Sequence, residues 1–531
     1  MQYPVLERMK GSEAAAAQLV AEGVDTVFTI PGLHNVHLCD ALLDHSGLQI
    51  LTGRHEQGLA LMANGYTRAC DKIAVPLVIS GPGVINALTA LADAYLDSVP
   101  MVLIAAASDT GRLGTGALHE LKDQTGLLAS ICKWNTYVQH AGEIPEAIRT
   151  AFEQARSGRP GPAAVEIPMD IQTQEATVEI VPSRRPEPRG APQKDVADAV
   201  GRLTAARSPV MYVGDGAGAA DAGPEIVRLA DRLGIPCFTT ALAKGIVPEN
   251  HPLSLGNGLR REPIRAFLDE ADLALVVGSS LDEVDTGLWQ LELPENLIQI
   301  DVAPEMIGRN FPVAVGLLGD VKSVLQQVLV ELETKNPERG ASPAGRIASL
   351  KAAEAESLRD HPGWQYMRAI QDVLDEDAIV TNDAATANAW ALHWLQRTRP
   401  RTMNISSGLA TLGFALPSAV GAKAAHPDRQ VLALVGDGGF LFSDYALSTA
   451  VQHRLGVVTI VFNDNCYSTI KRQQLALFGR AVASDLHNPD FPRLAEAYGA
   501  TGAVARTPDQ LRDALLTAWR QELPTLIEVP L

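Results

Sequence analysis

Residues 431–440 read VLALVGDGGF, a run of five apolar residues that leads directly into the turn Gly-Asp-Gly-Gly. Such a run is typical of a strand that is buried on both faces of a parallel sheet. The glycines let backbone N–H groups approach a phosphate, but the carboxylate of Asp437 would repel a bare phosphate. A divalent cation between the two groups would remove this repulsion. The stretch therefore predicts a strand edge that binds a metal-associated phosphate.

The next apolar run, at 457–462, ends at the polar sequence Asn463-Asp464-Asn465. Oxygen-bearing side chains of this kind suit Mg²⁺. Asp464 follows Asp437 by 27 residues, and a β-α-β unit needs about 30 residues. Both loops are therefore expected at the same carboxyl edge of neighbouring parallel strands. Each motif alone would also fit an ordinary turn, but the spacing favours a shared site.

Similar apolar runs alternate with longer helical patterns along the whole chain, which is typical of parallel α/β sheets. The segment 182–192 contains five Pro or Gly residues, and a second polar stretch covers 335–345. These breaks predict three doubly wound α/β domains at 1–181, 193–334 and 360–531. The predicted strands are 26–30, 75–79, 101–105 and 163–167, then 210–213, 273–277 and 297–302, then 378–381, 431–435, 457–462 and 525–529.

The charge of the chain is strongly acidic. It has 44 Lys and Arg against 62 Asp and Glu, a formal net charge of −18. A field of this sign repels a nucleic acid backbone, so nucleic acid is not expected as a partner. Five cysteines without a C-x-x-C pair argue against a disulfide framework and fit a reducing cytoplasm. No apolar run of about 18 residues and no signal peptide pattern is found, so we expect a cytoplasmic protein without a membrane span.

The two spaced motifs resemble the cofactor motif of thiamine diphosphate enzymes. Three further segments resemble the acetolactate synthase-like group of 2-oxo acid decarboxylases and carboligases. They are RHEQGLALMANGYTRA at 54–69, GPGVINALTALADAYLDSVP at 81–100 and SSGLATLGFALPSAVGAKAAHPDRQ at 406–430. The resemblance implies that the first domain binds the aminopyrimidine of thiamine diphosphate, and that the third domain binds the diphosphate with Mg²⁺.

The middle domain opens with VGDGAGA at 213–219, which approximates a dinucleotide-binding fingerprint. Ala219 replaces the third glycine, and no acidic residue ends a clear second strand about 20 residues later. NAD is therefore not expected. Some proteins of the family bind FAD in this domain and many bind nothing, and we do not expect FAD here.

The resemblance assigns Glu56 to the carboxylate that faces N1′ of the pyrimidine. A carboxyl group there favours the imino tautomer, whose 4′ nitrogen takes the proton from C2 of the thiazolium ring. This role needs a carboxyl group enclosed by apolar neighbours. An isolated Glu is more often a surface residue of an amphipathic helix, but the surrounding motif favours the catalytic assignment.

The resemblance also assigns the remaining cofactor contacts. Leu412 matches the apolar residue over which the cofactor bends, and the carbonyl of Ala410 matches the acceptor of its 4′ amine. The diphosphate end is assigned to Thr386, Ala387, Gly436, Asp437, Gly438, Gly439, Asp464 and Tyr467.

Three groups match the Mg²⁺ ligands of the family: the carboxylates of Asp437 and Asp464 and the carbonyl of Cys466. Many family members carry Asn at the position of Asp464, so an additional negative charge is expected at the metal here. Asp is a competent ligand for a hard cation.

Three residues are assigned to the substrate side of the site. His119 falls where acetolactate synthases carry a Gln beside the reacting carbon, and Lys133 matches a Lys that they share. His34 follows the first strand, near the position of C2 in the family. A His titrates near neutral pH and could relay a proton or position a carboxylate. The alternative for His34 and His119 is that both are hydrogen-bonded loop residues.

We interpret the chain as an enzyme that releases carbon dioxide from a 2-oxo acid and forms an aldehyde. One alternative is an acetolactate synthase-type carboligase, and another is a catalytically silent regulatory homologue, against which the intact motifs argue. Segments 30–38 (IPGLHNVHL) and 116–124 (GALHELKDQ) resemble 2-oxoarginine decarboxylases. In this family the site lies between subunits, which implies a homodimer or homotetramer.

The resemblance to 2-oxoarginine decarboxylases predicts a substrate with a long or guanidino side chain. Asp109, Glu120 and Asp123 are expected next to the substrate pocket and could attract a cationic tail. Charged residues of this kind are also common on a solvated surface.

Overall fold

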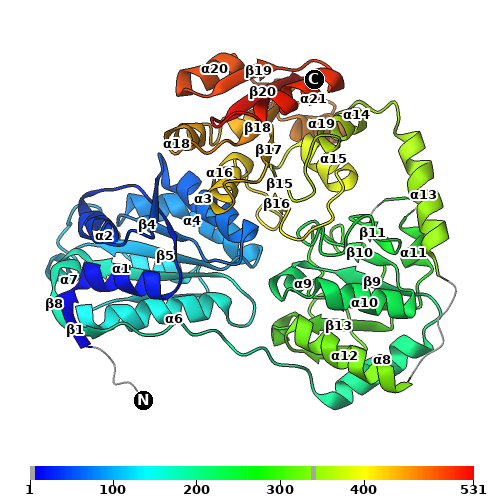
Figure 1. Cartoon of the computed structure of the whole chain (residues 1–531), viewed down its shortest axis with the longest axis horizontal. Coiled ribbons are helices and arrows are strands. Elements are labelled where there is room, and N and C mark those ends of the chain that lie inside the picture. Colours follow the sequence, from blue (N-terminus) through cyan, green and yellow to red (C-terminus); the bar gives the residue numbers. More distant parts are fainter. Residues whose placement is uncertain (1–5, 260, 263, 336–341) are drawn as a thin grey trace.

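The computed structural model describes residues 6–259, 261–262, 264–335 and 342–531. Within these residues the chain forms three six-stranded parallel sheets and one two-stranded antiparallel pair, β1 (Leu6–Lys10) with β8 (Glu175–Glu179). Figure 1 shows the blue and cyan first domain beside the green middle domain, with the yellow to red third domain above both. The predicted fold class is confirmed.

The first sheet has the strand order β3-β2-β4-β5-β7-β6. Its strands are β2 (Thr26–Thr29), β3 (Gln49–Thr52), β4 (Val75–Val78), β5 (Met101–Ala107), β6 (Trp134–Tyr137) and β7 (Pro162–Pro168). Its helices are α1 (Gly11–Ala21), η1 (Leu33–Asn35), α2 (Val36–Leu42), α3 (Glu56–Ala69), α4 (Pro82–Leu96), η2 (Thr110–Arg112), α5 (Gln124–Ala129), η3 (Ala141–Glu143), α6 (Ile144–Arg156) and α7 (Met169–Thr173).

The middle sheet has the order β11-β10-β9-β12-β13-β14. Its strands are β9 (Pro209–Val213), β10 (Cys237–Thr239), β11 (Ser254–Gly256), β12 (Leu273–Val277), β13 (Leu297–Asp301) and β14 (Val315–Leu318). Its helices are α8 (Gln193–Ala205), α9 (Asp215–Ala219), α10 (Gly223–Leu233), α11 (Ala266–Asp269), η4 (Pro304–Met306) and α12 (Val321–Lys335). The glycine-rich turn after β9 is tightly packed, because a Cβ on Gly214 would lie 2.2 Å from the carbonyl oxygen of Gly278.

The third sheet has the order β16-β15-β17-β18-β20-β19, and α13 (Ala344–Ser357) leads to it from the middle domain (Figure 1). Its strands are β15 (Ile379–Asn382), β16 (Met403–Ile405), β17 (Val431–Gly436), β18 (Val458–Asn463), β19 (Thr501–Val504) and β20 (Thr525–Pro530). Its helices are α14 (Pro362–Gln371), α15 (Thr386–Trp394), α16 (Ala415–Ala425), α17 (Asp437–Phe440), α18 (Ala446–Gln452), α19 (Ser468–Phe478), α20 (Phe491–Tyr498) and α21 (Pro508–Ala518).

Every predicted strand is present, and most of the strands that the sequence pattern missed lie at sheet edges. β3, β6 and β19 are half-exposed, while β11 and β16 have only three residues. Strands in the middle of a parallel sheet are covered on both faces and form continuous apolar runs. Short or half-exposed edge strands lack this signal.

The first and third domains share one hydrophobic core. Helix α3 crosses α16 with their backbones nearly touching, since a Cβ on Gly65 would lie 2.2 Å from the carbonyl oxygen of Ser418. A Cβ on Gly421 would lie 1.8 Å from the carbonyl oxygen of Met62. This contact sets how the two domains lie relative to each other. No helix in the described part of the chain is both long and apolar enough to span a membrane.

Candidate active site

Glu56 is the first residue of α3, and its carboxylate lies beside the N-terminal turn of α4. Its Oε2 accepts a hydrogen bond from Asn86 Nδ2 at 2.9 Å. A Cβ on Gly83 would lie 3.6 Å from Glu56 Oε1, so this side of the carboxylate faces a residue without a side chain. His55 caps α3 by accepting the Gln57 N–H. The start of a helix favours a negative charge, which suits an ionisable carboxyl group at this position.

His34 and Ser80 lie at the point where the strand order of the first sheet reverses, between β2 and β4. In open α/β sheets, ligands bind at the carboxyl edge at this point. His34 Nδ1 and Ser80 Oγ are 2.8 Å apart, and His34 is 4% exposed. Burial, followed by the nearby charge of His119, lowers the pKa of His34, although Asp109 opposes this. The neutral imidazole of His34 is therefore favoured.

His119 lies against His34 with its ring edge-on, and the ring centroids are 5.0 Å apart. Its backbone φ is +61°, a left-handed conformation. A Cβ on Gly81 would lie 2.3 Å from the His119 carbonyl oxygen, so the loop that carries His119 is pressed onto the start of α4. His119 Nδ1 is buried and has no hydrogen-bond partner within the described residues. The N-terminus of α4 therefore brings Glu56 and the two histidines into one region.

Lys133 does not belong to this region. It precedes β6 and so lies at the amino end of that strand, whereas the histidines lie at the carboxyl edge. Its ammonium group donates to the carbonyl of Gln154 at 2.8 Å and to the carbonyl of Ser157, at the end of α6. Burial lowers the pKa of Lys133 to about 8. The resemblance assigned Lys133 to the substrate side of the site together with His34 and His119. In the structure Lys133 lies away from the two histidines, because its side chain binds the C-terminus of α6.

The second group of candidate residues lies at the carboxyl edge of the third sheet, between β15 and β17. A Cβ on Gly436 would lie 3.2 Å from Ala385 Cβ, and a Cβ on Gly438 would lie 2.4 Å from Tyr467 Cε1. These two glycines therefore lie directly against the loops after β15 and β18. Thr386 and Ala387 begin α15, and Gly439 follows in the same turn as Asp437.

Two side chains that the sequence pattern did not single out join this group. Ser468 Oγ is 3.2 Å from Thr386 Oγ1, and Arg472 Nη2 donates to the same hydroxyl at 3.1 Å. Both lie on α19, which follows the metal-ligand loop. A cation beside a glycine-rich turn is a suitable partner for a phosphate. The sequence signal for Arg472 was a positively charged residue shortly after the Asn-Asp-Asn motif at 463–465.

The carboxylates of Asp437 and Asp464 lie close enough to influence each other. Burial raises the pKa of Asp437, and the charge of Asp464 adds to the rise. Asp437 Oδ2 accepts from Asn488 Nδ2 at 2.6 Å, and the same nitrogen donates to Asn463 Oδ1 at 3.0 Å. Asp464 Oδ1 accepts the Cys466 N–H at 3.3 Å. Several oxygen atoms thus converge on one side of the turn.

The loop that carries Ala410 and Leu412 is anchored at both ends. The Asp383 carboxylate accepts the Gly413 N–H, with Oδ2 at 2.9 Å, and burial raises the pKa of Asp383 to about 7. At the other end, Asp97 Oδ1 accepts the Gly408 N–H at 2.7 Å. Leu412 lines a cavity of about 570 Å³ between the first and third domains. Asp383, a polar residue directly after an apolar strand, was also missed in the sequence.

Comparison with known proteins gives the family. Profiles of thiamine pyrophosphate enzymes match the chain at 9–127 (N-terminal TPP binding domain), 196–328 (central domain) and 383–529 (C-terminal TPP binding domain). The chain is 33% identical to the probable acetolactate synthase large subunit of Methanocaldococcus jannaschii, over 98% of this chain and 92% of that protein. The chain belongs to the thiamine pyrophosphate enzyme family.

Two further relatives differ in the reaction that their names give. The probable 2-ketoarginine decarboxylase of Pseudomonas aeruginosa is 35% identical over 98% of this chain and 94% of its own length. The acetolactate synthase isozyme 2 large subunit of Escherichia coli is 32% identical over 98% of this chain and 95% of its own length. Both a decarboxylase and a carboligase are therefore related to this thiamine pyrophosphate enzyme over nearly its full length.

The donor groups fit a diphosphate that is bound together with a divalent cation. The described residues contain no cluster of three or more His, Cys, Asp and Glu arranged to hold a metal alone. Two neighbouring carboxylates and a backbone carbonyl leave coordination positions that diphosphate oxygens and water can fill. The mutual repulsion of Asp437 and Asp464 would also be relieved by a cation. Thiamine pyrophosphate binding, expected from the motifs, is confirmed by the family, while Mg²⁺ is considered below.

Proposed function

We propose that this thiamine pyrophosphate enzyme decarboxylates a 2-oxo acid and releases the corresponding aldehyde. The observation that carries the proposal is the His34–His119 pair, with ring centroids 5.0 Å apart, at the strand reversal beside Glu56. When bound, thiamine diphosphate supplies the electron sink for cleavage of the bond to the carboxylate. The side chains of the chain then decide whether the remaining carbon is protonated or attacks a second carbonyl.

Glu56 serves as the proton-exchanging group for the pyrimidine. Among the described residues its carboxylate accepts a hydrogen bond from Asn86 alone and faces Gly83 on the other side, so it has room for a ring nitrogen. A carboxyl group can hold or release the proton at N1′, whereas an amide cannot.

The histidine pair serves as the proton source for aldehyde formation. Because burial favours the neutral form of His34, that residue is suited to orient His119 rather than to carry a charge. His119 Nδ1 is buried and has no hydrogen-bond partner among the described residues, so His119 is the stronger candidate for the proton donor. It delivers a proton to the carbon that has lost carbon dioxide, and solvent restores that proton.

The third domain holds the diphosphate and Mg²⁺. Asp437, Asp464 and the carbonyl of Cys466 would hold the cation, and the amides of 436–439, the amides of Thr386 and Ala387 and the side chain of Tyr467 would bind the diphosphate. The carbonyl of Ala410 and the side chain of Leu412 would contact the rest of the cofactor. Arg472 adds a positive charge beside Thr386.

The active form is a homodimer or homotetramer with the site at the subunit interface. Exposed apolar side chains near the candidate cofactor loops support this, since Phe442 is 48%, Leu477 66% and Phe478 70% exposed. Exposed apolar groups of this size favour burial against another surface. Light scattering at assay concentration tests the assembly, and a fully active monomer would contradict it.

Five free cysteines support a cytoplasmic location.

The decisive experiment is a panel of 2-oxo acids with thiamine diphosphate and Mg²⁺, in which carbon dioxide, aldehyde and acetolactate are all measured. Aldehyde and carbon dioxide in equal amounts are expected. The second candidate function is an acetolactate synthase-type carboligase, which relatives of similar identity favour. Conversion of pyruvate to acetolactate, with no aldehyde from any acid in the panel, would establish that alternative.

A further inference from the structure

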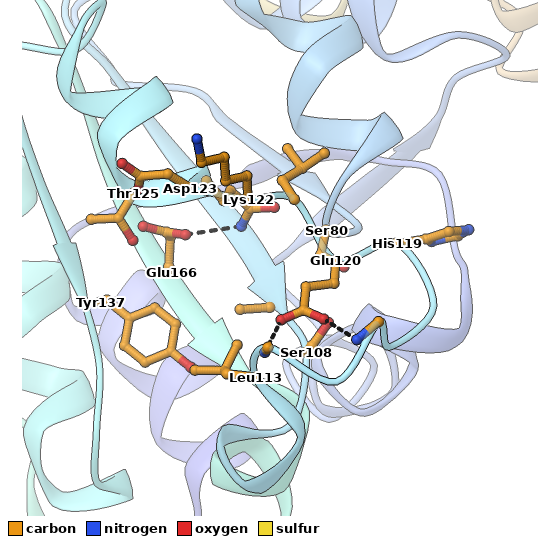
Figure 2. Close-up of a pocket in the computed structure, with 15 residues that line it drawn as sticks. Ser80, Ser108, Leu113, His119, Glu120, Lys122, Asp123, Thr125, Tyr137 and Glu166 are labelled. Carbon is orange, nitrogen blue, oxygen red and sulfur yellow. Dashed lines mark hydrogen bonds between the residues drawn. The ribbon is translucent and has the colours of Figure 1, made fainter.

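A cavity of about 620 Å³ begins at His119 and extends along the carboxyl edge of the first sheet. It is formed by the ends of β5, β6 and β7 and by the loop that carries His119. Figure 2 shows Glu166 and Tyr137 on one side of this cavity and Glu120 and His119 on the other. Since His119 belongs to the proposed reaction site, the cavity is positioned to take the side chain of the substrate.

The acidic residues that the sequence suggested for this cavity are engaged elsewhere. Asp109 pairs with Arg112, with 3.3 Å between Oδ2 and Nε. Glu120 Oε2 accepts the N–H groups of Gly116 and Ala117 at 2.9 and 3.0 Å and so folds its own loop. Asp123 caps α5 through the Gly126 N–H at 2.7 Å.

Glu166 is different, because its carboxylate is buried and only partly satisfied. It lies in β7 and is 1% exposed, yet it lines the cavity. Oε2 accepts from Gln124 Nε2 at 2.9 Å, while Oε1 has no hydrogen-bond partner of acceptable geometry within the described residues. Burial raises the pKa of Glu166, against the lowering effect of Thr125 and Gln124. A buried carboxylate without a cation is costly, and retaining one usually has a reason.

Two hydroxyl groups around the same cavity also lack partners. Ser108 Oγ and Tyr137 Oη are buried and make no hydrogen bond within the described residues, and both residues line the cavity. Lys122 also lines it, but its side chain is exposed. A ligand with one positive charge and several N–H donors would satisfy the carboxylate and both hydroxyls together.

We propose that Glu166 binds the cationic end of the substrate side chain, so that the enzyme selects 2-oxo acids that end in a guanidinium or ammonium group. This inference rests on the proposed function, because it needs the reacting carbon near His119. Tyr137 and Ser108 accept further N–H groups of the same cationic end. The substrate therefore extends from the histidine pair to β7.

Binding of non-reacting probes tests the subsite without turnover. The probes are 4-guanidinobutanoate and its uncharged isostere 4-ureidobutanoate, titrated by calorimetry into the full chain with thiamine diphosphate and Mg²⁺. We expect the guanidino probe to bind about 30-fold more tightly, since leaving a buried charge unpaired is costly. In Glu166→Gln the ratio of the affinities for the guanidino and ureido probes should fall to nearly one. Glu187→Gln, an exposed change of the same type, should retain the wild-type ratio.

The second part of the test measures turnover of 5-guanidino-2-oxopentanoate and 5-ureido-2-oxopentanoate. Glu166→Gln should lower kcat/KM for the guanidino acid and leave that for the ureido acid nearly unchanged. Tyr137→Phe should produce a smaller loss for the guanidino acid, and it provides a test if Glu166→Gln does not fold. A wild-type protein without preference for the charged probe, or variants that retain the full preference, would overturn the proposal. A charge preference in binding without any decarboxylation would retain the subsite and reject the proposed function.

Discussion

Asp97 in the first domain accepts a hydrogen bond from the backbone N–H of Gly408 in the third domain, with 2.7 Å between Oδ1 and the nitrogen. The other oxygen of Asp97 pairs with Arg68 at 2.7 Å, and both side chains are almost fully buried. The guanidinium of Arg68 lies 5.3 Å from the ring centroid of Phe414. The buried ion pair therefore anchors the Gly408 end of the loop that carries Leu412 and contacts Phe414 beyond its other end.

Removing one partner of this buried pair should destabilise the protein strongly. We expect Arg68→Met to lower the free energy of unfolding by about 3–5 kcal/mol, because Asp93 and Asp97 would be left as uncompensated buried charges. Chemical denaturation measures the change. The matched control is Arg346→Met, which breaks an exposed pair with Glu270 and should cost less than about 1 kcal/mol. Similar losses in the free energy of unfolding for the two variants would contradict the structural role of the buried pair of Arg68 and Asp97.

Glu56→Gln should fold normally and lose activity by about 10²- to 10⁴-fold, because an amide cannot exchange a proton with the pyrimidine. The direct readout is deuterium exchange at C2 of the bound cofactor. Its Asn86 contact can persist, since the Gln side-chain oxygen can still accept that hydrogen bond. Exchange at the wild-type rate in this variant would remove Glu56 from the proposed role.

Binding of thiamine diphosphate should depend on a divalent cation, since the diphosphate and the two carboxylates repel one another without it. Asp437→Ala should weaken cofactor binding strongly. Asp464→Asn should weaken it only slightly, since an amide oxygen is also a suitable cation ligand. Fluorescence titration at several Mg²⁺ concentrations measures both. Equal losses would indicate a different role for Asp464.

Lys133→Met should leave kcat nearly unchanged and alter the pH dependence of stability. Burial lowers the pKa of Lys133 to about 8 in the folded chain, below its usual 10.5. Between these two pH values the unfolded chain binds more protons, so the free energy of unfolding should rise with pH there. The variant should lose this rise in denaturation measured from pH 8 to 10.5. A large loss of kcat would return Lys133 to the active site.

The position of the two loops at one edge of the third sheet could be predicted, because it follows from local sequence. The turn at 436–439 and the Asn-Asp sequence after β18 are strand-end motifs, and the parallel topology brings strand ends to one edge. His34 and His119 were grouped by the resemblance to the family, and the structure brings their rings into contact. The anchors of these loops, Asp383 and Asp97, could not be predicted, since each acts on a backbone N–H in a distant segment.

The sequence by itself determined the fold class and the central strands, because a strand covered on both faces must be apolar along its whole length. The tertiary structure alone decided which charged side chains line the cavity beside His119. Lys133 turns to the C-terminus of α6, at the amino edge of the sheet, while Glu166 lies in the middle of an apolar strand and faces the cavity. The sequence near a residue does not specify its burial or its partners across the sheet, since both depend on segments that are distant along the chain.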